Sequence, residues 1–324
     1  MRQNLINRGD MGDLYRKVRQ RGLSFLFSKL HLNPDKRIWQ TWNHIQHESN
    51  WWEVPGVRAR WNELSTGQVD LHYSAFFAQQ FLTARSDLRM LSVGCGTGSP
   101  ELQFAKQPQI SRLEAFDLAP NLIKEAQQRA QKGGYAHLHF FTADVYDYQP
   151  APESYDVLLF HSSLHHFSDP GGLLSTYQSC LKPGGYLILN EYVGPNRLQF
   201  PAHQVRAMQA MLESIPEAFR ERASGGMKKS VFAPGSLRMI LNDPSEAVQS
   251  ADILPAVHQL FNLRHEAGYG GNLLHLVLKD IAHNFLEEST VSREVLQDLF
   301  QQEDAYLKAH PGSDFVFGVY QKPD

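Results

Sequence analysis

The sequence predicts an α/β protein built on a doubly wound parallel sheet, and three observations indicate this class. A short apolar run, Met90–Val93, leads directly into a bend that contains three glycines. Further apolar runs of strand length follow at 111–118, 138–142, 155–160 and 186–190. Helical patterns separate most of these runs. Strands that alternate with helices in this way pair in parallel, and ligands bind beyond their carboxyl ends.

Composition limits the class of protein and its partners. The chain has 324 residues, 42% of them hydrophobic and 20% charged, which suffices for a substantial core. The net charge of −3 gives no general attraction to nucleic acid. Two cysteines, Cys95 and Cys180, do not make a disulfide framework or a cysteine-based zinc site. No membrane span or signal peptide is evident, so we expect a cytoplasmic protein with no stable membrane insertion and no nucleic-acid partner.

Residues 1–85 precede the first strand and are expected to form a helical cap or lid. The basic stretch that begins at Arg8 also carries apolar residues, which is typical of a solvated helix face or, alternatively, of a helix on an anionic membrane. All five tryptophans lie between Trp39 and Trp61, where they would form either a small helical core or an aromatic pocket. Residues 73–84 have the spacing of an amphipathic helix that leads into the first strand.

The glycine bend, residues 94–98, joins the first strand to a short helix. Glycine accepts positive φ and lets a ligand approach the backbone closely. Ser99 is expected to be the N-cap and Pro100 the first helical residue, so free amides would face a ligand, as in nucleotide sites. The bend alone also fits an NAD-dependent Rossmann oxidoreductase, because Asp117 lies about 20 residues further on.

Polar residues follow the next strands at the same edge of the expected sheet. The strand at 111–118 contains Asp117 near its end, where a carboxylate accepts hydrogen bonds from ribose hydroxyls or else caps the following helix. The third strand is followed by Ala143-Asp144-Val145. The apolar strand at 155–160 is typical of a central parallel strand, and a histidine-rich segment, residues 161–167, comes directly after it.

Six motifs, in this order and spacing, resemble those of class I S-adenosylmethionine-dependent methyltransferases. They are Leu91–Gly98, Phe116–Leu118, Ala143–Val145, Tyr155–Leu158, Leu164–Phe167 and Leu181–Leu187. The Leu-Lys-Pro-Gly-Gly turn in the last motif has no counterpart in the NAD fingerprint. The resemblance covers residues 85–195. It implies a Rossmann-like seven-stranded sheet in which residues 315–320 form the antiparallel last strand, expected at the edge.

The resemblance implies S-adenosylmethionine as the cofactor and S-adenosylhomocysteine as its product. Gly94, Gly96 and Gly98 would approach the methionine moiety, and His161 would face that end of the cofactor. The family usually has an acidic residue two positions before the first glycine, and this chain has Ser92 there. Recognition of the cofactor's amino group would then depend on backbone carbonyls or on another acid.

The resemblance also assigns the nucleoside end of the cofactor. Asp117 would hold the ribose and Leu118 would lie against the adenine. Asp144 would accept a hydrogen bond from the adenine amino group, and Val145 would lie beside the ring.

Methyl transfer from a sulfonium is an in-line displacement, so the protein mainly supplies alignment and a water-poor site. A hydroxyl acceptor also needs a general base. His165 or His166 is the first candidate, because imidazole titrates near neutrality, and Glu191 is the next. The alternatives are that the histidines pack the loop and that Glu191 pairs with an arginine. His161 and His165 have a spacing that suits zinc only on a helix, so we expect no metal.

The rest of the chain is expected to complete the fold around this site. We divide the chain into the cap at 1–85, a cofactor-binding core at 86–194, a helical insertion over the acceptor site at 195–245, and the remainder of the core at 246–324. In the insertion, residues 223–229 are expected to form a mobile basic loop, either solvated or in contact with an acidic acceptor.

These observations predict a methyltransferase that transfers a methyl group to a hydroxyl of a small-molecule or glycan-like acceptor, with nitrogen or carbon as second choices. Helices on both sides of the core suggest an enclosed site for a compact acceptor. Two alternatives stay open, an NAD-dependent oxidoreductase and a non-catalytic partner protein that keeps the cofactor fold. Apolar helices near each terminus would suit a homodimer interface.

Overall fold

The computed structural model describes Leu5, Asp10 and residues 50–323. The chain forms two compact units. The core unit comprises Leu71–Val193, Ala247–Ala267 and Val316–Asp324. The helical unit comprises Met1–Asp70, Gly194–Glu246 and Gly268–Phe315. Most of the expected N-terminal cap, including Trp39 and Trp42, lies outside the described residues.

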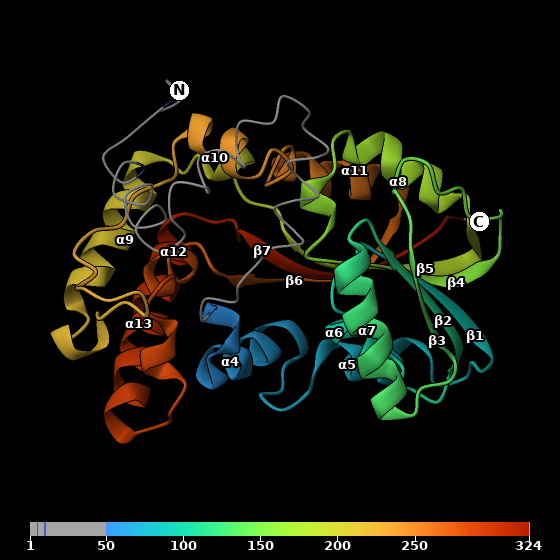
Figure 1. The fold of residues 1–324 in the computed structure, drawn as a ribbon, viewed down its shortest axis with the longest axis horizontal. Coiled ribbons are helices and arrows are strands. Elements are labelled where there is room, and N and C mark those ends of the chain that lie inside the picture. Colours follow the sequence, from blue (N-terminus) through green and yellow to red (C-terminus); the bar gives the residue numbers. More distant parts are fainter. Residues whose placement is uncertain (1–4, 6–9, 11–49, 324) are drawn as a thin grey trace. The chain divides into compact units, whose positions relative to one another are not determined.

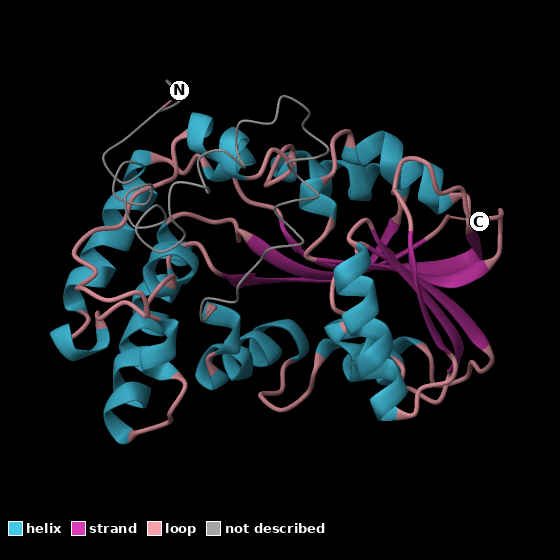
Figure 2. Ribbon diagram, in the orientation of Figure 1, coloured by secondary structure: helices cyan, strands magenta, loops and turns pink. Residues whose placement is uncertain are grey.

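The strands form one seven-stranded sheet in the order β3-β2-β1-β4-β5-β7-β6 (Figures 1 and 2). Their bounds are β1 Leu88–Val93, β2 Ile110–Asp117, β3 Leu138–Thr142, β4 Tyr155–His161, β5 Leu181–Tyr192, β6 Asn262–Gly270 and β7 Phe315–Gln321. Strands β1 to β5 pair in parallel. Antiparallel pairing of the last strand completes a mixed sheet, which confirms the predicted fold class.

The position of each strand in the sheet explains its burial. Every residue of the central strand β4 is buried except His161 at its carboxyl end. The expectation that residues 315–320 form an edge strand is wrong, because β7 lies between β5 and β6 and buries its five middle residues. The edge strand is β6, whose first three residues are exposed.

The Leu-Lys-Pro-Gly-Gly segment, expected as a turn before the fifth strand, lies within β5. Tyr155 pairs with Leu181, whereas Val157 pairs with Tyr186, so the intervening residues bulge out of the ladder. Gly184 has a φ of 68°, a conformation that glycine adopts without strain and that a bulge of this kind requires.

Helices cover both faces of the sheet in the core unit, as a doubly wound fold requires (Figure 1). The helices are α5 Tyr73–Phe81, α6 Ser99–Phe104, α7 Pro120–Gly133, α8 Pro170–Gln178 and α11 Ile253–Leu260. Helices α8 and α11 lie on one face, and α5, α6 and α7 on the other. Leu174 and Tyr177 of α8 and Val257 of α11 are buried in one apolar cluster with Leu158 of β4.

Two expected helix boundaries differ from the structure. The N-cap of α6 is Gly98 and not Ser99, because the left-handed conformation of Gly98 (φ 75°) already turns the chain into the helix. The residues Asp243-Pro244-Ser245-Glu246 are typical of a helix start and predict a helix to about Leu260. The structure has turns there until a 3-10 turn at Ser250–Asp252, and α11 begins at Ile253. Charged and small residues in that stretch leave too few apolar positions for a helix face.

The helical unit has its own small core. Its helices are the 3-10 helix Trp51–Glu53, α4 Pro55–Thr66, α9 Ala202–Ser214, α10 Ser236–Asn242, α12 Leu274–Leu278 and α13 Thr290–Ala309. Trp51 is buried, with ring centroids 4.6 Å from Trp61, 5.2 Å from Phe315 and 5.5 Å from His275. Trp51 and Trp61 therefore belong to a packed core, whereas Trp52 is 46% exposed.

The expectation of a mobile basic loop at 223–229 is wrong for Lys228. Its side chain is buried, and its Nζ donates to the carbonyl oxygens of Leu276, Val277 and Lys279 at 2.7, 2.9 and 2.5 Å. A backbone bridge between Glu221 and Met227 closes the loop in front of it. Lys228 thus ties the loop to the C-terminal end of α12.

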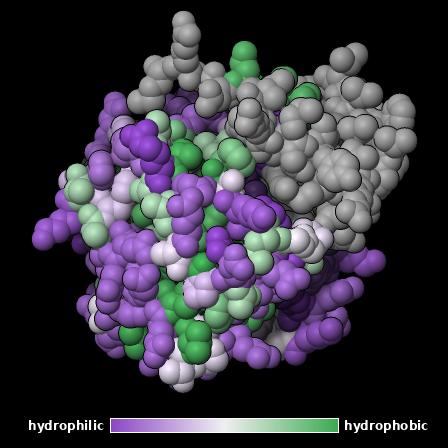
Figure 3. All heavy atoms as spheres, turned by 90° about the vertical axis from the view of Figure 1, so that its left-hand side faces the viewer, coloured by the Kyte–Doolittle hydropathy of each residue, from purple (hydrophilic) through white to green (hydrophobic). Residues whose placement is uncertain are grey.

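The side of the molecule that carries α9 and α13 is mainly hydrophilic, with apolar side chains scattered among polar ones (Figure 3). Within residues 50–323, none of the helices combines the length and the apolar composition needed to cross a bilayer.

Candidate active site

The glycine bend connects β1 to α6 at the carboxyl edge of the sheet. Gly94, Gly96 and Gly98 all have positive φ, between 53° and 75°. A Cβ on Gly94 or Gly98 would come within 2.6 Å of a neighbouring side chain, so these two glycines pack against protein. A Cβ on Gly96 would meet no atom of the described residues within 4 Å. The backbone at Gly96 is therefore open to a ligand.

Asp117, at the end of β2, supports this bend directly. Its Oδ2 accepts a hydrogen bond from the Gly96 amide and its Oδ1 accepts one from the Ala119 amide, both at 2.9 Å. Burial raises the pKa of Asp117, and these amide bonds oppose the rise. Each carboxylate oxygen has a second lone pair, so Asp117 can still accept hydrogen bonds from a ribose beside Gly96. Leu118, the next residue, is exposed.

Asp144 and Val145 follow β3, beside the end of β2. The Ala143 amide donates to the Asp117 carbonyl at 3.2 Å, which brings the two acidic loops together. Asp144 Oδ1 accepts a hydrogen bond from the Tyr146 amide at 2.8 Å. Val145 is buried, and its carbonyl accepts a hydrogen bond from the Tyr177 hydroxyl at 3.0 Å. The two aspartates and the glycine bend thus share one edge of the sheet.

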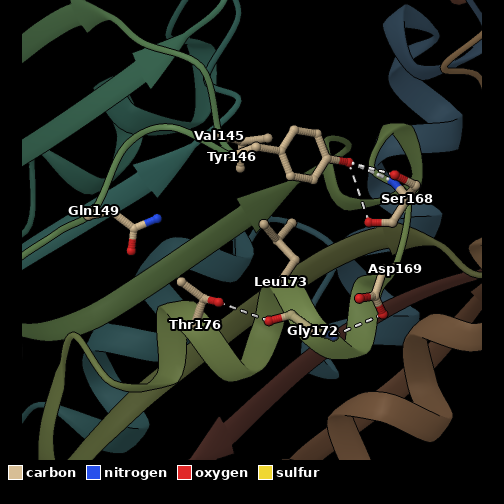
Figure 4. Close-up of a pocket in the computed structure, with 8 residues that line it drawn as sticks. All are labelled: Val145, Tyr146, Gln149, Ser168, Asp169, Gly172, Leu173 and Thr176. Atoms are coloured by element: carbon tan, nitrogen blue, oxygen red, sulfur yellow. Dashed lines mark hydrogen bonds between the residues drawn. The ribbon is translucent and has the colours of Figure 1, made fainter.

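A pocket of about 270 Å³ lies between this loop and the start of α8 (Figure 4). Its lining residues are Val145, Tyr146, Gln149, Ser168, Asp169, Gly172, Leu173 and Thr176. The Tyr146 hydroxyl accepts a hydrogen bond from the Ser168 amide at 2.8 Å and holds the two loops together. Of the site residues expected from the sequence, Val145 alone lines this pocket.

His161, the last residue of β4, is held by Tyr73 of α5. The Tyr73 hydroxyl and His161 Nδ1 are 2.9 Å apart, and the two rings are stacked. Burial lowers the pKa of His161 to about 4, so the ring is neutral at physiological pH. With so low a pKa the His161 imidazole is a weak base, although it can still donate or accept a hydrogen bond.

His165 forms a close pair with Glu191 of β5. His165 Nδ1 lies 2.7 Å from Glu191 Oε2. Glu191 is fully buried, and its Oε1 accepts hydrogen bonds from the Ser163 and Leu164 amides at 2.5 and 2.6 Å. Burial favours protonation of Glu191, but the interactions with His165 and the two amides outweigh it and lower the pKa. Glu191 is therefore an ionised carboxylate that holds both the loop and the imidazole.

His166 lies beside His165 and acts electrostatically on Asp117. Its ring centroid is 4.1 Å from that of His165, and it is half-buried. Its charge, when protonated, lowers the pKa of Asp117. The histidine segment and Asp117 are thus electrostatically coupled.

The structure adds one residue that the sequence analysis missed, Glu101 in the first turn of α6. The Ser92 hydroxyl donates to Glu101 Oε1 at 2.6 Å, and both side chains are buried. Burial raises the pKa of Glu101 to about 7. The only signal in the sequence was the missing acid at position 92 together with an acid nine residues later.

Comparison with known proteins identifies the class of this site. A family model described as a methyltransferase domain matches residues 84–289. The chain therefore belongs to this family, the class I S-adenosylmethionine-dependent methyltransferases, and its cofactor is S-adenosylmethionine. This assignment decides against the NAD-dependent oxidoreductase alternative.

Two curated relatives are similar to part of the chain. The malonyl-[acyl-carrier protein] O-methyltransferase of Paenibacillus sp. is 28% identical over 43% of this chain and 55% of its own length. The ubiquinone biosynthesis O-methyltransferase of Xanthomonas euvesicatoria is 29% identical over 44% of this chain and 61% of its own. The chain spans between 34% and 61% of the length of the first curated relatives that it matches.

A solved structure supports the fold. Phosphoethanolamine N-methyltransferase 2 of Haemonchus contortus, in complex with S-adenosyl-L-methionine, superposes with a TM-score of 0.51 at 16% identity. The match covers 89% of this chain and 60% of that one.

Proposed function

We propose that this protein methylates a hydroxyl group of a small-molecule acceptor, with His165 as the general base. The observation that carries the proposal is the buried His165–Glu191 pair beside the cofactor residues. A hydroxyl must lose its proton when it is methylated, whereas a neutral amine is already a nucleophile. A histidine held by a buried carboxylate is an arrangement that serves proton removal.

The residues present fit the cofactor. Gly96 offers an open stretch of backbone, and the two carboxylates of Asp117 and Asp144 lie at the same edge, where the hydroxyls of a ribose and the amino group of an adenine would find acceptors. Leu118 and Val145 would supply apolar contacts to the adenine ring. When bound, S-adenosylmethionine supplies a methyl group already activated for transfer to a nucleophile.

The pair itself defines the path of the proton. With Nδ1 bound to Glu191, a proton from the acceptor hydroxyl would go to His165 Nε2. The ionised Glu191 would then stabilise the imidazolium that forms. Glu191, which had been a second candidate for the base, is in this proposal a positioning residue, because amides and His165 already occupy its oxygens. His161 and His166 would line the site without taking the proton.

The two curated relatives reported above are O-methyltransferases, whereas the solved structure is of an N-methyltransferase, so the choice of an oxygen acceptor depends on the His165–Glu191 pair and not on these names. A carboxylate is also an oxygen acceptor, but it needs no base. The His165–Glu191 pair therefore favours a hydroxyl over a carboxyl group.

The experiment compares transfer of a labelled methyl group to panels of hydroxyl, carboxyl and amine acceptors. For the hydroxyl acceptor, His165→Gln should lower kcat by about 10² to 10⁴ and leave the affinity for S-adenosylhomocysteine unchanged. His139→Gln, on the exposed side of β3, is the matched control and should behave as wild type.

Three results would count against the proposal. Full hydroxyl transfer by His165→Gln would exclude the base, and transfer to amines alone would exclude the hydroxyl acceptor. Cofactor binding without turnover on any panel would favour the non-catalytic alternative.

A further inference from the structure

The carboxylate expected two residues before Gly94 is absent from the sequence, but a carboxylate reaches the same place from another element. Ser92 on β1 donates its hydroxyl hydrogen to Glu101 Oε1 at 2.6 Å. The exposed fractions of the two residues are 1% and 0%. Glu101 belongs to the first turn of α6, so its side chain returns beneath the bend that separates the two elements.

The second oxygen of Glu101 has no hydrogen-bond partner among the described residues. This atom, Oε2, is buried. Leaving a buried carboxylate oxygen without a donor is unfavourable, and such an atom in a native site calls for an explanation. Glu101 also makes electrostatic contact with the bend, since it raises the pKa of the Cys95 thiol.

Among residues 50–323, no lysine or arginine side chain donates a hydrogen bond to this carboxylate. Within the described part of the chain, Arg129 of α7 lowers the pKa of Glu101, but its effect is weaker than those of burial, Ser92 and Asp117. Arg129 donates instead to the carbonyl and hydroxyl of Thr97 and to the Ser99 hydroxyl, at 2.8 to 3.1 Å. A cationic group of a bound molecule would therefore complement the ionised form of Glu101.

We propose that Glu101 recognises the ammonium group of the cofactor's methionine moiety, with Ser92 holding its other oxygen in place. This inference rests on the proposed function, because it concerns the same cofactor site. An ammonium group has three donors and a full positive charge, which Oε2 would accept and balance. In this chain the carboxylate has moved from β1 to α6, and a serine has taken its former position.

The alternative is that Glu101 only joins α6 to β1 through its bond with Ser92. The two roles differ in which ligand they affect. S-adenosylhomocysteine carries the ammonium group, whereas 5′-methylthioadenosine has the same adenosine and thioether but no amino-acid part. A residue that binds the ammonium affects only the first ligand, and a residue that supports the bend affects both.

The experiment is isothermal titration of both ligands into the full chain and its Glu101→Gln variant. Glutamine keeps the size and the acceptor for Ser92, so the variant tests the charge. We expect Glu101→Gln to weaken S-adenosylhomocysteine about 10-fold to 100-fold, as loss of a charged hydrogen bond does, and to change 5′-methylthioadenosine less than about twofold. Glu125→Gln, an exposed change on α7, is the matched control and should alter neither.

A swap variant tests the position of the charge. Ser92→Asp combined with Glu101→Gln returns a carboxylate to β1 and should recover most of the lost affinity for S-adenosylhomocysteine. Equal weakening of both ligands by Glu101→Gln, or no weakening of either, would overturn the inference. Wild-type protein that binds neither ligand would overturn the proposed function itself, so the two failures are distinguishable.

The pH dependence of wild-type binding gives a second measurement that needs no variant. The groups that face Glu101 are Ser92, Cys95, Asp117 and Arg129. Protonation of Asp117 would affect both ligands, since both contain the ribose, and the raised pKa of the Cys95 thiol keeps it protonated between pH 5.5 and 8. The ratio of the affinity for S-adenosylhomocysteine to the affinity for 5′-methylthioadenosine therefore follows the protonation of Glu101. It should fall as the pH drops from 8 to 5.5, and a constant ratio would contradict the inference.

Discussion

Replacement of Glu101 by glutamine should stabilise the protein without ligand, and increasingly so at higher pH. The folded protein holds the pKa of Glu101 at about 7, against an ordinary value of 4.5, because the side chain is buried. The folded state therefore binds this proton more tightly than the unfolded state. Stability that is present below pH 4.5 is lost as the pH rises through 7. The difference between the pKa of Glu101 in the folded protein and its ordinary value corresponds to about 3 kcal/mol of unfolding free energy.

The assay is urea unfolding of wild type and Glu101→Gln at pH 5 and pH 8 without cofactor. Over this range the gap in unfolding free energy between variant and wild type should widen by about 2.5 kcal/mol, most of the full difference. Acids that do not interact with Glu101 titrate alike in both proteins and cancel in the comparison. Glu125→Gln should show no such widening.

Parallel pH profiles for wild type and Glu101→Gln would refute the reasoning, because they would mean that Glu101 is ionised as easily in the folded protein as in water. A gap that narrows towards pH 8 would refute it more strongly, since the ionised side chain would then have a favourable partner within the protein.

Three further outcomes are expected. Gly98→Ala should lower the unfolding free energy by about 2 to 4 kcal/mol in urea titrations. The alanine Cβ would lie 2.5 Å from the Phe140 ring, and the φ of 75° is strained for alanine. A loss under about 0.5 kcal/mol would contradict this explanation. Glu191→Gln should reduce kcat at least 10-fold while S-adenosylhomocysteine affinity stays within threefold in titration calorimetry, and unchanged kcat would show that it does not position His165. Lys228→Met should cost about 2 to 4 kcal/mol, measured by denaturant midpoint, because three carbonyls lose their donor; unchanged stability would mean that water replaces it.

The elements with strong local patterns were predictable from the sequence. The first four strands were expected within two residues of their bounds, since each is a short apolar run between turn or helix signals; β5 begins five residues before the expected start. Helix α7 also matches, because Gly134 in the left-handed conformation ends it where the glycine pair was expected to. Local chemistry determines these features.

What depends on pairing between distant residues was not predictable. The bulge at Gly184 depends on the register of β5 against β4, and the inner position of β7 depends on where β6 pairs. The burial of Lys228 depends on carbonyls that lie about fifty residues further along the chain. A lysine beside glycines has the same local pattern whether it is solvated or buried.

The candidate site also has a part that was predictable from local motifs and a part that was not. The glycines and the two aspartates follow from motifs, and the structure brings them to one edge of the sheet. The pairing of His165 with Glu191 was not foreseen, although both residues were candidates. Glu101 was missed because a lone acid in a first helical turn usually serves only the helix dipole.

The two cysteines give the protein an internal reporter of cofactor binding. Both thiols are unpaired and buried, and burial raises the pKa of each. Cys180 is fully enclosed in the apolar cluster under α8, whereas Cys95 is part of the glycine bend itself. Alkylation of Cys95 should therefore report how often the bend opens, with Cys180 as the reference within the same chain. Protection of Cys95 by S-adenosylhomocysteine would then measure occupancy before any acceptor is known.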